Sequence, residues 1–109
     1  LNLDSCGLDE EACAALFEGL VAPALKTLIL ESNGLGARGG AALAAAVQRG
    51  ALPALEELDL TDCALGDEAG AELLQALARR TEAASPLRVL ILWDNGLGAG
   101  SAAAMVAAL

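Results

Sequence analysis

The sequence predicts an α/β solenoid, in which a curved parallel sheet lines the concave side and helices cover the convex side. Strand-like and helical segments alternate four times along the 109 residues, and the copies share one leucine pattern. Hydrophobic residues make up 56% of the chain, but aromatic residues only 2%. The core must therefore be built from small aliphatic side chains, which favours thin stacked layers.

The four strand-like segments follow the pattern L-x-x-L-x-L-x-x-(N/C)-x-L. They are residues 1–8, which lack the opening of the pattern, and residues 25–35, 55–65 and 87–97. The N/C position recurs at intervals of 27, 30 and 32 residues, at Cys6, Asn33, Cys63 and Asn95. The chain is thus divided into four repeats, 1–24, 25–54, 55–86 and 87–109. The extra residues of the longest interval, within 79–85, are expected to form a loop outside the stack.

Within each strand-like segment, alternate side chains point to opposite faces of the sheet. The inward-facing set is expected to be leucine throughout: Leu1, Leu3, Leu28, Leu30, Leu58, Leu60, Leu90 and Leu92. Side by side, the segments form a parallel sheet. Its spacing is narrower than that of the helices behind it, so the stack curves.

The segments between the strands are predicted to be helices. Positions four, eight and twelve after the last leucine of the strand pattern share one helix face. Position four holds only small residues. The larger residues of that face are expected to pack behind the sheet: Leu16, Leu20, Leu43, Val47, Leu73, Leu77, Met105 and Leu109.

Asn33 and Asn95 lie where the chain leaves the sheet, and their side chains are expected to bond backbone groups of the neighbouring turn. Cys6 and Cys63 fill the same position with a small buried group. The spacing of the three cysteines, with Cys13, matches no zinc motif, so no metal site is expected. Free buried thiols favour a reducing compartment and a cytoplasmic protein.

This pattern resembles the ribonuclease-inhibitor-like class of leucine-rich repeats over the whole chain. The alternation of Cys- and Asn-type repeats is similar to that of ribonuclease inhibitor itself, although the 32-residue interval departs from the usual near-constant repeat length. The resemblance implies a leucine-rich-repeat solenoid that binds other proteins. Two alternatives stay open: the ligand-sensing arm of a nucleotide-binding-domain immune-type receptor, and a GTPase-activating protein of the Ran-activator type.

The charge of the chain argues against nucleic acid and membrane as partners. The formal net charge is −9, and the six Lys and Arg residues form no basic stripe. The longest apolar stretches, 41–47 and 102–109, fall far short of the roughly 20 residues that cross a bilayer.

Catalysis has few candidate residues. The chain has no His and no Tyr, and nothing in the sequence separates Asp59 and Asp62 into an acid and a base. The glycine-rich stretches 33–40 and 95–100 lack the lysine of a phosphate-binding loop and are interpreted as turns that enter helices. We therefore expect neither an enzyme nor a cofactor.

The concave sheet face is the predicted binding surface, because the helices cover only the other face. Its most prominent residue is Trp93, the only Trp; it is either an interface anchor or a ring folded over Ile91 or Thr61. Apolar residues inside an acidic rim suit another protein with a basic surface. The predicted binding residues are Trp93, Ile91, Val89, Asp94, Asp59, Thr61, Asp62, Glu57, Ile29, Glu31 and Asp4.

Neither end of the sequence carries the polar cap expected of a terminal repeat. The residues 1–3 read as strand, and residues 102–109 as an apolar helix. We therefore expect either a piece of a longer array or a chain whose two ends are covered by a partner, acting as a scaffold or as a subunit of a larger assembly.

Overall fold

The structure, a computed structural model, describes residues 2–79, 87–92, 95–96 and 98. Within these residues strands and helices alternate as predicted: α1 (Glu10–Glu18), β1 (Thr27–Ile29), α2 (Gly36–Gln48), β2 (Glu57–Asp59), α3 (Gly66–Ala78) and β3 (Val89–Ile91). The predicted fourth helix, with Met105 and Leu109, and most of the predicted loop at 79–85 lie outside the described residues.

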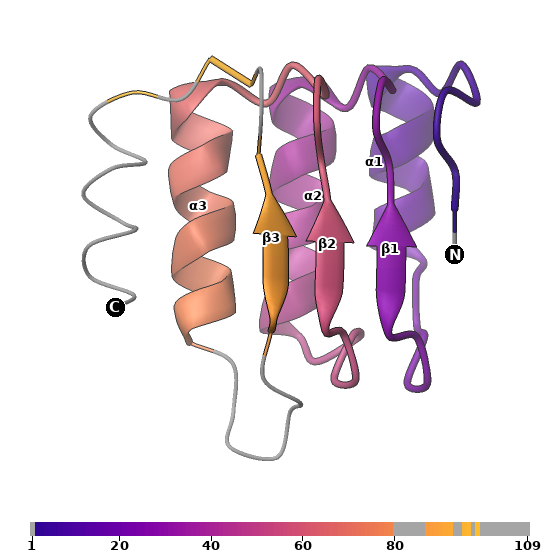
Figure 1. Cartoon of the computed structure of the whole chain (residues 1–109), viewed down its shortest axis with the longest axis vertical. Coiled ribbons are helices and arrows are strands. Elements are labelled where there is room, and N and C mark those ends of the chain that lie inside the picture. Colours follow the sequence, from indigo (N-terminus) through magenta and orange to yellow (C-terminus); the bar gives the residue numbers. More distant parts are fainter. Residues whose placement is uncertain (1, 80–86, 93–94, 97, 99–109) are drawn as a thin grey trace.

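The strands form one parallel sheet in the order β1-β2-β3, and the helices lie together on one side of it (Figure 1). Leu28 pairs with Leu58, which pairs with Leu90, so equivalent positions of successive repeats lie side by side. Asn2 forms a parallel bridge to Ile29 and brings the first segment to the edge of β1. The predicted α/β arrangement of consecutive, laterally stacked repeats is confirmed for this part of the chain.

Leucine fills the space between the sheet and the helices, as the alternation predicts. The inward-facing leucines of the second and third repeats are fully buried: Leu28, Leu30, Leu58 and Leu60. Leu3, Leu90 and Leu92 are partly buried against the same core, and Leu1 lies outside the described residues. Burial of one leucine side chain stabilises the fold by about 1.5–3 kcal/mol, so this layer is the main source of cohesion.

Helices α2 and α3 present the predicted face to the core. Leu43 and Leu73 are fully buried, eight residues after the N-cap residues Leu35 and Leu65. Gly39, four residues after the N-cap of α2, lets α1 approach closely: a Cβ atom there would lie 3.2 Å from the Cβ of Cys13. Small residues at position four therefore set the distance between neighbouring helices.

The predicted core face of the first helix is wrong at Leu16, whereas Leu20 packs partly buried against the core as predicted. Leu16 is 37% exposed, and Phe17 is fully buried in its place. The N-cap of α1 is Asp9, whose side chain accepts a hydrogen bond from the backbone N–H of Ala12. This helix therefore starts two residues after Leu8, whereas α2 and α3 start one residue after the equivalent leucines. One residue turns a helix face by about 100°, which moves Leu16 off the core.

Asn33 binds three backbone groups, two in the first repeat and one in its own repeat. Its Nδ2 donates to the carbonyl oxygens of Leu3 at 2.6 Å and Leu30 at 3.1 Å, and its Oδ1 accepts from the N–H of Leu8 at 3.2 Å. Asn95 repeats the arrangement between the third and fourth repeats, with Nδ2 donating to Leu60 O at 2.6 Å. The predicted bonds to the neighbouring turn are confirmed.

The two cysteines at the same position differ from one another. Cys63 is fully buried, and its thiol donates to Leu30 O, in the preceding repeat, at 3.0 Å. Cys6 is exposed, which corrects the prediction that both are buried, and its thiol contacts only Asp4 O, at 3.6 Å. The position is buried by the preceding repeat, and no described segment covers Cys6 on that side.

Polar side chains also connect successive helices. The Oε1 atom of Glu10, at the start of α1, accepts from the backbone N–H of Arg38 at 2.8 Å. At the other end of α1, Nη2 of Arg49 donates to the carbonyl oxygens of Phe17 at 2.6 Å and Leu20 at 2.9 Å. Glu10 thus caps the N-terminus of α2, whereas Arg49, the C-cap residue of α2, binds the C-terminal end of α1 and supplies the positive charge that a helix C-terminus favours.

Candidate functional site

The candidate site is the sheet face that points away from the helices, which we call the open face. Leu28 and Leu58 point into the core, so the residues beside them in each strand point the other way. The helices lie behind the sheet in Figure 1, and the open face is turned to the viewer. Its described residues are Asn2, Asp4, Thr27, Ile29, Glu31, Glu57, Asp59, Thr61, Val89 and Ile91.

These residues form rows that run across the strands. The register places Thr27, Glu57 and Val89 in a first row. The second row is Asn2–Ile29–Asp59–Ile91, with Asn2 added by its bridge to Ile29. Both rows follow from the alternation of strand side chains once the leucines are aligned.

A third row continues beyond the strands. Backbone hydrogen bonds from Ser5 N to Glu31 O at 2.8 Å and from Ser32 N to Thr61 O at 2.9 Å extend the ladder and align Asp4, Glu31 and Thr61. Trp93 and Asp94, two of the predicted binding residues, lie outside the described residues. Their role in binding stays a prediction.

The chain leaves the sheet after this row in the same way in three repeats. Ser5, Ser32 and Asp62 have positive φ angles of 50°, 58° and 54°. This left-handed conformation is uncommon outside glycine, and its recurrence makes the exit turns equivalent. Asp62 is exposed on its turn, next to the open face and not within a row.

Asp59, at the centre of the open face, has a fixed side chain. Its Oδ1 accepts from the N–H of Thr61 at 3.0 Å and from the hydroxyl of Thr61 at 2.7 Å. These two bonds orient the carboxylate. Asp59 therefore presents a preorganised negative charge on β2.

Apolar side chains flank that charge. Ile29 on β1 and Ile91 on β3 are half-buried, and Val89 is 39% exposed. Ile29 and Ile91 are the only two isoleucines of the chain. An apolar side chain that remains partly solvated on a sheet is one that a partner can bury.

The open face is also acidic. Its described positions include the carboxylates of Asp4, Glu31, Glu57 and Asp59, and none of them is Lys or Arg. The face therefore attracts cationic groups and repels anionic ones, in line with the net charge of −9 for the whole chain.

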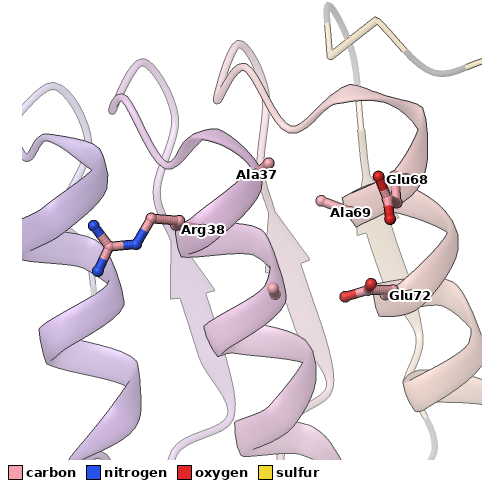
Figure 2. Close-up of a pocket in the computed structure, with 6 residues that line it drawn as sticks. Ala37, Arg38, Glu68, Ala69 and Glu72 are labelled. Atoms are coloured by element: carbon pink, nitrogen blue, oxygen red, sulfur yellow. The ribbon is translucent and has the colours of Figure 1, made fainter.

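A shallow groove of about 250 Å³ lies on the other side of the molecule, between α2 and α3. Figure 2 shows Glu68 and Glu72 on the α3 side of the groove, while the side chain of Arg38 extends toward α1. This groove was not among the predicted binding sites. The available signal was the i, i+4 spacing of two alanines and two glutamates: Ala37, Ala41, Glu68 and Glu72.

The buried thiols are held in their neutral form. Burial, with a smaller contribution from Asp9, raises the pKa of Cys13. Burial also raises the pKa of Cys63 from 9.0 to about 11, and the nearby Cys13 and Asp59 add to the effect. Such thiols are poor nucleophiles and poor metal ligands near neutral pH.

Within the described part of the chain, His, Cys, Asp and Glu nowhere form a group of three that could hold a metal ion. No described helix has the length and apolar composition needed to cross a membrane.

Comparison with protein families finds leucine-rich repeats in two segments of the chain. The leucine-rich repeat family model matches residues 21–44 and 52–74, which span β1 and β2 and parts of α2 and α3. A comparison with curated protein sequences gives no match. The family match and the parallel sheet backed by helices agree on an α/β leucine-rich-repeat fold.

Proposed function

Taking the chain as a leucine-rich repeat protein, we propose that it binds a partner protein on the open face and acts by binding, not by catalysis. Leucine-rich repeats commonly serve as protein-interaction modules. The observation that carries the proposal is a parallel sheet whose described helices all lie on one side of it (Figure 1). Parallel sheets are usually covered on both faces, so a partner is the natural cover for the second.

The partner that fits this face has a basic surface with apolar residues. The carboxylates of Glu31, Glu57 and Asp59 favour cationic groups, and steering by such charges speeds association. Ile29 and Ile91 supply apolar area for burial. We further propose Trp93 as an anchor of the same interface, because Trp is enriched among the residues that dominate binding energy.

Within the leucine-rich repeats, we assign the chain to the ribonuclease-inhibitor-like class and place the open face on the concave side of a curved array. The 13-residue helices α2 and α3 and the alternation of Asn33, Cys63 and Asn95 support this class. We also propose a cytoplasmic scaffold or subunit of a larger assembly. Its support is the free state of the three cysteines, which suits a reducing compartment.

The test compares three baits in affinity capture from cell extract: the native protein, Ile29→Thr and Val21→Thr. Val21 is 76% exposed and lies between α1 and β1, away from the open face, so it is a matched apolar control. Thr keeps the β-branched shape in the strand. Circular dichroism verifies that all three baits are folded.

A partner of the open face is captured by the native and Val21→Thr baits, and much less of it is captured by Ile29→Thr. Its affinity, measured with purified proteins, decreases as salt rises, because the contact includes charges. If every captured protein binds Ile29→Thr as well as it binds Val21→Thr, the open face is not the interface.

A further inference from the structure

The second row of the open face alternates apolar, acidic and apolar side chains. Ile29 on β1, Asp59 on β2 and Ile91 on β3 are direct neighbours in the register. Adjacent strands are about 4.8 Å apart, so the two isoleucines are separated by about 9.6 Å, with the oriented carboxylate halfway between them.

Different backbone conformations in a partner match this spacing to different degrees. An α-helix rises about 1.5 Å per residue, so positions i and i+7 share a face about 10.5 Å apart, with i+3 and i+4 between them. In an extended strand, side chains on one face recur every two residues, at about 6.6–6.8 Å and then at about 13 Å. A strand therefore cannot place side chains on both isoleucines at the same time. A polyproline helix spans about 9.3 Å in three residues but places no side chain halfway on that face.

The charges favour the same occupant. Asp59 lies at the midpoint, and Glu57 and Glu31 lie in the rows on either side of it. A helix over the second row would bring basic residues at i+3 and i+4 to this acidic centre. Its two apolar residues would contact Ile29 and Ile91. Val89, on the same strand as Ile91, enlarges the apolar surface at that end.

We propose that the partner presents an amphipathic helix, laid across the strands, with apolar residues at i and i+7 and Lys or Arg at i+3 or i+4. This inference rests on the proposed function of the open face and adds the form of the partner. The helix crosses β1, β2 and β3 and buries Ile29 and Ile91 together.

The probe is a lactam-bridged helical peptide with leucine at i and i+7 and lysine at i+3 and i+4; the bridge is needed because short helices are marginal in water. A control peptide of the same composition moves the second leucine to i+5, about 140° around the helix. Binding is followed on ¹³C-labelled isoleucine methyl groups, since the chain has only Ile29 and Ile91.

The matched peptide is expected to shift both isoleucine signals and to bind at least about tenfold more tightly than the control. Asp59→Asn keeps the oxygen that accepts the hydrogen bond from Thr61, and it weakens binding of the matched peptide about two- to fivefold. Glu68→Gln removes the same charge from the helix side and leaves binding unchanged.

Equal binding of the two peptides, movement of only one isoleucine signal, or no movement at millimolar peptide overturns the inference. The proposed function is judged separately by captured proteins. If those proteins still lose binding with Ile29→Thr while the peptides show no preference, only the helical form of the partner is wrong.

Discussion

Replacement of Asn33 by alanine tests the bond between the first two repeats. The substitution removes three hydrogen bonds to backbone groups, and Asn33 is only 2% exposed. Leu30 O keeps the thiol of Cys63 as a donor, so Leu3 O and Leu8 N–H are the groups left without this partner. At about 1–1.5 kcal/mol for each orphaned group, the expected loss is about 2–3 kcal/mol.

That loss is large for this chain, because domains are stable by roughly 0.05 kcal/mol per residue or somewhat more, which is about 5 kcal/mol here. Urea denaturation followed by circular dichroism measures it as a lower midpoint at unchanged slope. Cys63→Ala is the matched control, since its thiol makes one short bond, to Leu30 O, and should cost about 1 kcal/mol. The loss of stability in Asn33→Cys should lie between the losses in Asn33→Ala and Cys63→Ala. A loss below about 1 kcal/mol for Asn33→Ala, or one equal to that of Cys63→Ala, refutes the reasoning.

Three further predictions concern contacts between repeats. Arg49→Met removes the donors to Phe17 O and Leu20 O and should lower the free energy of unfolding by about 1–2 kcal/mol in the same urea assay. Arg38→Met is the control: the Arg38 side chain makes neither bond, so its loss should lower the free energy of unfolding by less than about 0.5 kcal/mol. Gly40→Val should lower the free energy of unfolding by about 2–4 kcal/mol, because even a Cβ atom there would lie 2.8 Å from Leu65 Cδ2 and 3.0 Å from Ala69 Cβ. Ala45→Val, at an exposed position of the same helix, is the control. Equal melting temperatures of the two variants would contradict close helix packing. The pKa of Cys63 is raised from 9.0 to about 11 in the folded state, so folding favours the neutral thiol. The stability that this preference contributes is fully present below pH 9 and is lost as the pH rises to about 11. Over that range the native protein should lose about 2–3 kcal/mol of stability relative to Cys63→Ala. Parallel pH profiles of the two proteins would show that the thiol is not desolvated.

The strand register could be predicted from the sequence because it rests on a period of two. Once Leu28, Leu58 and Leu90 are aligned, their neighbours are assigned to the other face, and the rows of Ile29 and Asp59 follow. The role of Asn33 was also predictable, since an amide at a turn carries both donors and an acceptor.

The errors arose where one repeat differs from the next. The shifted face of α1 depends on Asp9, whose side chain caps the helix; an N-cap residue followed by Glu10 and Glu11 was a signal that could have placed the helix start. The exposure of Cys6 could not come from a repeat pattern, because burial at that position depends on the preceding repeat. The bonds of Arg49 have no local signal, since they cross to α1.

The most direct test of the central claim is the solvent accessibility of the isoleucine methyl groups. A neutral paramagnetic agent is added to the free protein, labelled on isoleucine and leucine methyl groups, and the relaxation of each signal is measured. The signals of Ile29 and Ile91 should relax much faster than those of Leu30, Leu58 and Leu60, which are fully buried. If the isoleucine signals are as protected as the leucine signals, the sheet has no open face, and the account of partner binding fails.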